Sequence, residues 1–169
     1  MDKMALIDTG YLEYEELKSI QKLPGNERYS KGPVAVIECV QEIPCNPCEA
    51  ACLKGAIKIG EPIINLPTVD FDKCVGCGIC VAKCSGMAIF IVDKSYSETT
   101  AAVTFPYEYY PLPKVGSFVK GVNRKGEVVC GGKIVKTMNP KFYDHTCVVT
   151  LEIPQEFADE VRSIKREVL

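Results

Sequence analysis

Eight of the ten cysteines in this chain fall into two runs of nearly equal spacing. The first run reads Cys39-x5-Cys45-x2-Cys48-x3-Cys52, and the second reads Cys74-x2-Cys77-x2-Cys80-x3-Cys84. Thiolates are soft ligands, and several of them on one tight loop suit zinc or the iron corners of an iron–sulfur cluster. The residue types and their spacing therefore predict metal chemistry.

The spacing favours two [4Fe-4S] clusters over any single ion. A cluster has four iron corners that each take one thiolate, and closely spaced cysteines on one loop reach three of them. In the two-cluster arrangement, the short helix after the loop carries the remote cysteine of each run to the other cluster. We therefore define two sets of cysteines. The first-cluster set is Cys39, Cys45, Cys48 and Cys84, and the second-cluster set is Cys74, Cys77, Cys80 and Cys52.

Two glycines in the second loop, Gly76 and Gly78, fit the same chemistry. Glycine lets the backbone approach the cluster closely and offer N–H groups to its sulfides. An ordinary turn also calls for glycine at such positions, and within a cysteine loop the two interpretations coincide. Four isoleucines and a phenylalanine are expected in the apolar shell or the general core: Ile37, Ile57, Ile79, Ile89 and Phe90.

Residues 33–93 resemble a bacterial two-[4Fe-4S] ferredoxin module in which all eight ligand positions are filled. The resemblance implies the pseudo-twofold fold of that family, with two βαβ-like halves around a pair of clusters, and one-electron transfer without substrate chemistry. Two features depart from the family pattern. Leu53 and Ser85 replace the proline that usually follows each run, and the first gap of the first run has five residues.

Other metal and cofactor chemistries fit the sequence less well. A zinc site built from the two C-x2-C pairs, Cys45/Cys48 and Cys77/Cys80, leaves four cysteines unexplained. The C-x3-C-x2-C signature of radical S-adenosylmethionine chemistry is absent, as are G-x-G-x-x-G and a P-loop, although residues 126–134 come close to the latter. We therefore expect no catalytic site in this chain itself.

Composition supports metal binding in a soluble, cytoplasmic protein. The 169 residues are 47% hydrophobic and 25% charged, with a net charge of −2 that does not suit nucleic-acid binding. Neither a signal peptide nor a membrane span is predicted, and in the reducing cytoplasm structural disulfides are rare. Cys130 and Cys147 are expected to be buried free thiols, and the lone His145 to be structural or on the surface.

The periodicity predicts an α+β chain: a pseudo-twofold two-[4Fe-4S] ferredoxin fold, then a small antiparallel β unit, barrel or open sheet, with a C-terminal helix. The expected divisions are an N-terminal helical extension (1–32), the ferredoxin module (33–93), an aromatic and proline-rich connector (94–113) and the β unit (114–169). Expected elements are helices at about 11–22, 49–54, 81–85 and 154–169, and strands at about 32–39, 56–59, 88–92 and 146–153, with turns at 123–126 and 131–132.

The residues outside the cysteine module favour a subunit over a free carrier. Aromatic anchors dominate protein interfaces, and Tyr107, Tyr109 and Tyr110 are expected to be exposed. With GPVAVIECVQEIPCNPCEAAC and FPYEYYPLP, the whole chain also resembles the small iron–sulfur proteins that accompany FAD-dependent amino-acid or amine dehydrogenases in anaerobes. That resemblance implies a flavoprotein partner in a hetero-oligomer. A free-standing ferredoxin and a maturation or regulatory cluster protein are the alternatives.

Overall fold

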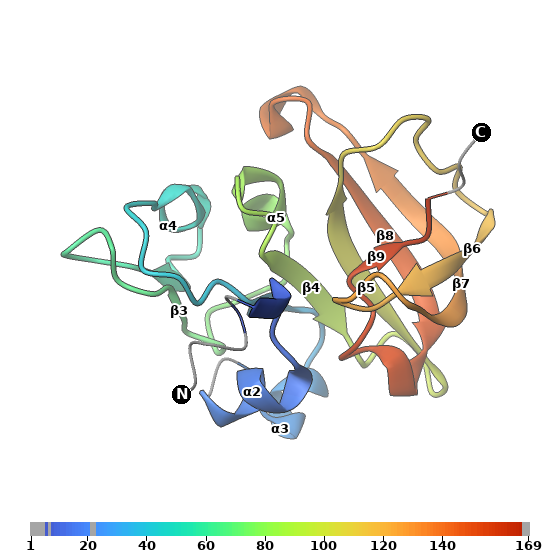
Figure 1. The fold of residues 1–169 in the computed structure, drawn as a ribbon, viewed down its shortest axis with the longest axis horizontal. Helices are drawn as coiled ribbons and strands as arrows, with labels where there is room; N and C mark the ends of the chain where they lie inside the picture. Colours follow the sequence, from blue (N-terminus) through green and yellow to red (C-terminus); the bar gives the residue numbers. More distant parts are fainter. Residues whose placement is uncertain (1–5, 7, 21–22, 167–169) are drawn as a thin grey trace.

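A computed structural model describes residues 6, 8–20 and 23–166, and an antiparallel sheet organises them (Figure 1). Seven strands follow one another in the order β1-β4-β5-β8-β7-β6-β9, with every neighbouring pair antiparallel. The strands are β1 (Val34–Ile37), β4 (Ile89–Asp93), β5 (Thr100–Tyr107), β6 (Phe118–Val122), β7 (Val128–Met138), β8 (Cys147–Pro154) and β9 (Ser163–Ile164). Because β1 and β9 are edges, the sheet is open, and the barrel alternative is wrong.

The cysteine-bearing part lies to one side of this sheet. Each cysteine loop leads into a short helix and then a strand, as the repeat predicts. The elements are α4 (Pro47–Ala51) with β2 (Ile57–Lys58), and α5 (Ile79–Lys83) with β4; β2 pairs with β3 (Thr68–Val69) in a separate two-stranded sheet. Both helices begin two residues earlier than expected. Pro47 suits a first helical turn, and Gly78, with φ of +81°, starts α5 from a left-handed position.

Beside the cysteine-bearing part, the described residues of the N-terminal extension include the short helices α2 (Tyr14–Ser19) and α3 (Asn26–Tyr29). The helix expected at about 11–22 is thus shorter at its start, where Glu13 and Glu16 form a capping box; its expected end at residues 21–22 lies outside the described residues. Gly25 is the N-cap residue of α3. The extension reaches the second cysteine loop through α3.

Residues 94–113, which the composition predicts to be a connector, contain β5, the strand between β4 and β8. Aromatic and proline residues misled the prediction, because Phe105 and Tyr107 belong to the apolar core of the sheet. Tyr107 is only 7% exposed, so its expected exposure is wrong, whereas Tyr109 is 50% and Tyr110 87% exposed. The strand joins the cysteine-bearing part and the C-terminal strands into one sheet.

The prediction of a C-terminal helix at 154–169 is wrong, because the described residues of this segment form no α-helix. A 3-10 turn at Gln155–Phe157 is followed by β9. Backbone bonds from Arg162 to Val122 (2.9 Å) and from Lys165 to Lys120 (2.7 Å) attach this segment to β6. Its apolar residues, which suggested a helix face, instead pack into the sheet core.

Of the two turns predicted near β7, one is present and the other is absent. The turn at 123–126 is confirmed between β6 and β7, but Gly131 and Gly132 lie inside β7. A Cβ on Gly132 would lie 2.7 Å from the carbonyl oxygen of Glu152. Glycine is therefore needed here because β7 and β8 approach closely, and not because the chain turns.

Glu38, which lies between the end of β1 and Cys39, binds two arginines from the C-terminal half. Arg124 donates Nε and Nη2 to its two carboxylate oxygens at 2.8 and 2.6 Å, and Arg162 donates Nε at 2.6 Å. The three side chains are only 5–11% exposed. Although burial alone would raise the pKa of Glu38, the charges of Arg162 and Arg124 lower it overall. We call these residues the Glu38 triad.

We predict that Glu38→Gln lowers the free energy of unfolding by about 3–5 kcal/mol, because it leaves two buried guanidinium groups without a counter-charge. Guanidinium denaturation of the anaerobic holoprotein at pH 7 measures the change. Glu27→Gln is the control, since Glu27 forms an exposed pair with Lys31 and should leave stability nearly unchanged. Equal losses from the two variants would contradict a special role for the triad.

Candidate metal centre

One cavity is lined by all four cysteines of the first-cluster set. It lies between the loop before α4 and the end of α5. Its cysteines are Cys39, Cys45, Cys48 and Cys84. The rest of its wall is mostly apolar and includes Ile37, Ile43, Ile59 and Ile89.

A second cavity is lined by all four cysteines of the second-cluster set. Its cysteines are Cys52, Cys74, Cys77 and Cys80, with Ala35, Ile57, Ile79 and Ile91 among the apolar lining residues. Cys52 of the first run therefore lines the second cavity, and Cys84 of the second run lines the first cavity. The other three cysteines of each run line one cavity together. The structure brings together the residues that the spacing groups crosswise.

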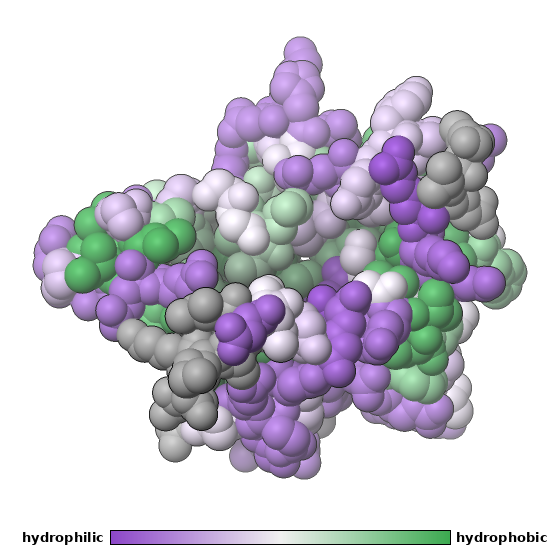
Figure 2. Space-filling view, viewed as in Figure 1, coloured by the Kyte–Doolittle hydropathy of each residue, from purple (hydrophilic) through white to green (hydrophobic). Residues whose placement is uncertain are grey.

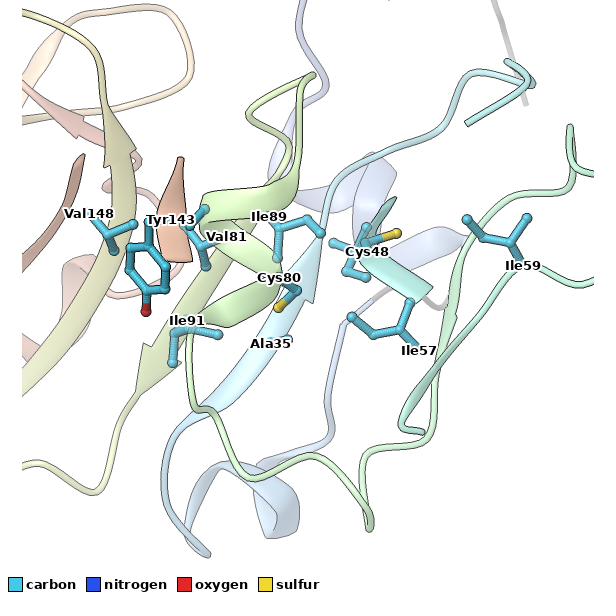
Figure 3. Packing of buried hydrophobic residues seen from close by; sticks show 12 residues of the cluster. Ala35, Cys48, Ile57, Ile59, Cys80, Val81, Ile89, Ile91, Tyr143 and Val148 are labelled. Atoms are coloured by element: carbon cyan, nitrogen blue, oxygen red, sulfur yellow. The ribbon is translucent and has the colours of Figure 1, made fainter. Parts of the chain in front are cut away.

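The apolar shell between the cavities follows from strand geometry. Ile37, Ile57 and Ile89 belong to one buried cluster that also holds Cys48 and Cys80 (Figure 3). Phe90, expected in this shell or in the general core, packs in the core formed by β5 and β8. Successive residues of β4 point to opposite faces of the sheet, so Ile89 and Ile91 face the cysteines while Phe90 does not.

The thiol groups fit an iron–sulfur cluster chemically. Among the described residues, no three Cys, His, Asp or Glu side chains converge closely enough to hold a single ion. Each cavity instead has four thiols on its wall, as a cluster with four corner irons requires. Burial first, and then the neighbouring Cys74 and Cys77, raise the pKa of Cys80 to about 12; burial and Cys84 raise that of Cys48 to about 11. Such thiols need a cation to release their protons.

Backbone N–H groups donate to several cysteine sulfurs, among them those of Cys52, Cys74 and Cys84. Ala56 donates to Cys52 at 3.2 Å and Ala88 donates to Cys84 at 3.4 Å, each four residues after its cysteine. Ala35 on β1 donates to Cys74 at 3.4 Å. The Ala56 and Ala88 bonds are equivalent in the two repeats. Hydrogen bonds to ligand sulfurs raise a cluster's potential, because they stabilise the more negative reduced form.

The two loop glycines differ in their surroundings. Gly76 lines the second cavity with φ of +62°, and a Cβ there would lie 2.6 Å from backbone atoms of Pro33. Gly78 caps α5, where a Cβ would meet only Ile91 at 3.9 Å. Gly76 is thus required by close packing and by its backbone angle, whereas Gly78 is required chiefly by its angle.

Arg28 on α3 positions the second loop, and nothing in the cysteine pattern indicated it. Its guanidinium donates to the carbonyl oxygens of Phe71 (2.6 Å), Gly32 (3.0 Å), Pro33 (3.0 Å) and Cys74 (2.7 Å). These carbonyls come from the segments before β1 and before Cys77. One planar group therefore holds together the two stretches of chain that carry the wall of the second cavity.

Tyr143, in the loop between β7 and β8, is a second residue that sequence reasoning missed. It is 3% exposed and belongs to the buried cluster around Cys80. Figure 3 shows its ring beside Val81 and Val148. Lys83 of α5 also forms an ion pair with Asp144 of the same loop. The C-terminal strands thus supply part of the shell of the cysteine module.

The remaining candidates lie away from the two cavities. Cys147 is buried in the sheet core, as expected, while Cys130 is only half-buried and packs at the border of that core. Burial raises the pKa of both thiols. His145 is exposed, in a turn with φ of +69°.

We predict that Arg28→Ala disrupts the second cavity and lowers the iron bound per chain, by about half where each cavity holds one cluster. Arg28→Lys should act in the same direction, because an ammonium group lacks the planar fork that reaches several carbonyls at once. Iron and acid-labile sulfide analysis after anaerobic reconstitution measures the loss. The control is Lys31→Ala in an exposed pair. Full iron content in both Arg28 variants would show that the loop holds its shape without this side chain.

Comparisons with known proteins agree with this chemistry. Residues 67–90, which contain the whole second cysteine run, match the family of 4Fe-4S binding domains. The chain is 30% identical over 83 residues to an uncharacterized ferredoxin of Methanocaldococcus jannaschii, covering 48% of this chain and 51% of that protein. It is 45% identical over 47 residues to a subunit of an ion-translocating oxidoreductase complex of Methanosarcina acetivorans, covering 28% of this chain and 17% of that protein.

The chain therefore spans about half the length of one of these curated relatives and under a fifth of the other. No solved structure matches it. Within the part of the chain that the structure describes, no helix combines the length and apolar character needed to cross a membrane. The protein contains an iron–sulfur domain that binds at least one [4Fe-4S] cluster and is related to ferredoxins, which indicates electron transfer.

Proposed function

We propose that this chain carries two [4Fe-4S] clusters in a ferredoxin-type fold and passes single electrons as the iron–sulfur subunit of a multi-subunit, flavin-dependent oxidoreductase in the cytoplasm. The observation that carries the proposal is the pair of cavities, each with four cysteine thiols on its wall. The first-cluster set would hold one cluster and the second-cluster set the other. Each cluster supplies one-electron redox chemistry when bound.

The cavities are close enough to share one apolar core. Cys48 of the first cavity and Cys80 of the second belong to the same buried cluster, and α4 packs on α5 between them. A negative charge on Cys48 would contribute to the raised pKa of Cys80. Neighbouring clusters in a low-dielectric core suit electron passage from one to the other without solvent in between.

Each cavity has exposed apolar residues near it where a redox partner would dock. Cys77 is exposed, and the nearby Val75 is 52% exposed, at the second cavity. Ile43, 47% exposed, lines the first cavity, and Leu53 is 84% exposed after α4. Figure 2 shows apolar surface at the end of the molecule that carries α4 and β3. Exposed apolar groups beside a redox centre favour protein contact.

The choice of a subunit over a free carrier rests on the relatives and on the extra segments. One relative's name makes it a subunit of an oxidoreductase complex, whereas the other's name, a ferredoxin, supports the carrier alternative. Tyr110 and Phe142, 87% and 60% exposed, offer aromatic anchors outside the cysteine module. The flavoprotein partner rests on the resemblance of the whole sequence.

We predict that Cys48→Ala and Cys84→Ala remove the same cluster, although the two residues belong to different runs. Cys80→Ala and Cys52→Ala should remove the other. Each variant should keep about four of eight irons. In EPR of the reduced proteins, the two variants of one pair should show the same spectrum, and the two pairs should differ from each other. Cys147→Ser, away from both cavities, should keep all iron. If Cys52 and Cys48 variants lost the same cluster instead, the crosswise assignment would be wrong.

We further expect the native protein, purified anaerobically from its source, to elute with a flavin-containing chain. Addition of that chain's substrate should reduce the clusters, seen as bleaching of their visible absorbance. Elution as a monomer that exchanges electrons equally well with unrelated reductases would favour the free-carrier alternative. The amplitude of this bleaching should be unchanged in the Cys147→Ser variant and halved in the Cys48→Ala variant. That result would show that the clusters are the groups being reduced.

A further inference from the structure

A large open cleft lies between the cysteine module and the C-terminal strands, and the electron-transfer proposal does not use it. Its volume of about 610 Å³ falls within the roughly 300–1,000 Å³ of common ligand pockets. Residues 86–88, between Cys84 and β4, form part of its wall, and β9 and its flanks form another part. The face shown in Figure 2 is hollowed near its centre, beside the β9 segment. We call it the Arg162 cleft.

The cleft has a strong positive bias. Among the described residues that line it, Glu38 is the one acidic side chain, and the basic ones are Arg124, Arg162, Lys165 and Arg166. Since Glu38 neutralises only one of these charges, three positive charges remain. A concave surface with walls of low dielectric constant concentrates such a field, and it would attract an anion.

Arg162 is held rigidly and has donor capacity left over. The residue is 6% exposed. Its Nε donates to Glu38, and its Nη1 donates to the carbonyl oxygens of Val161 (2.6 Å) and Ala158 (3.2 Å). Within the described part of the chain, its Nη2 has no hydrogen-bond partner. A buried charged donor without a partner is costly, so an acceptor from outside the chain would stabilise it.

Aromatic rings lie next to these charges. The Arg162 guanidinium carbon is 5.0 Å from the centre of the Phe90 ring, and that of Arg166 is 5.2 Å from the centre of the Tyr109 ring. Both rings line the cleft, and Tyr109 is half exposed. Flat apolar faces beside guanidinium groups suit a ligand that has both a planar ring and an anionic group.

We propose that the Arg162 cleft binds a nucleotide-class ligand, with its phosphate near Arg162 and Lys165 and its ring against Phe90 or Tyr109. The sequence motifs for nucleotide binding do not predict this site, because Arg124 and the two rings come from segments far in the chain from residues 162–166. The proposal stands on the cleft alone and does not require that electrons pass through the clusters. Binding beside the Cys84 segment would place the ligand next to the first cavity.

Isothermal titration of the anaerobic holoprotein with matched pairs tests the proposal. FMN is compared with riboflavin, ADP with adenosine, and inorganic phosphate is titrated alone. At least one of FMN and ADP should bind saturably, and its partner without phosphate should bind about 10–100-fold more weakly, because a charge-assisted hydrogen bond is lost. Phosphate alone should also bind at least about 10-fold more weakly, because it lacks the ring.

Variants locate the binding. Lys165→Ala with Arg166→Ala, both exposed, and Tyr109→Ala should each weaken nucleotide binding about 10-fold while leaving the visible spectrum of the clusters unchanged. The control is Lys133→Ala on β7, which is exposed and does not line the cleft. The proposal is overturned if neither nucleotide binds saturably below about 1 mM, if phosphate alone binds as tightly, or if the control and the cleft variants bind equally. None of these readouts measures electron transfer, so they leave the proposed function untouched.

Discussion

The carboxylate of Glu38 is the interaction on which the arrangement of this protein most depends. Arg124, which follows β6, and Arg162, which precedes β9, both bind it, and without it two buried guanidinium groups would face each other with no counter-charge. Glu38 also precedes Cys39, the first cysteine of the first run. The same contact therefore holds β9 in place, shapes one wall of the Arg162 cleft and anchors the loop of the first cavity.

The sheet extends this coupling to both halves of the chain. β1 and β4 flank the cysteine loops and pair with each other. β5 pairs with β4 on one side and with β8 on the other, so it connects the cysteine loops to the C-terminal strands. Tyr143 and Val148 come from the C-terminal half yet pack around Cys80. Residues far outside the cysteine runs thus help to enclose the cavities that the cysteines line. A small module held by its metal ligands alone would have less apolar surface to bury.

Metal binding and folding are linked in the same region. The buried thiols of Cys48 and Cys80 have raised pKa values, so at neutral pH they release protons only when a cation takes their place. Arg28, the backbone N–H groups of Ala56 and Ala88, and the apolar shell hold the loops in a shape ready for that exchange. The protein supplies geometry, hydrogen bonds and low dielectric, and the cluster supplies the redox chemistry.

The sequence by itself determined which cysteines line each of the two cavities, because ligand spacing within a tight loop is a local property and the repeat shows the same spacing twice. It also predicted the loop–helix–strand order and the turn at 123–126. Only the tertiary structure placed β5 and β9, since a strand with Pro106 and a segment with helical spacing have ambiguous local patterns. Arg28, Tyr143 and the Glu38 triad likewise became visible only in three dimensions. Their contacts join residues up to 124 positions apart, and no local pattern records such a distance.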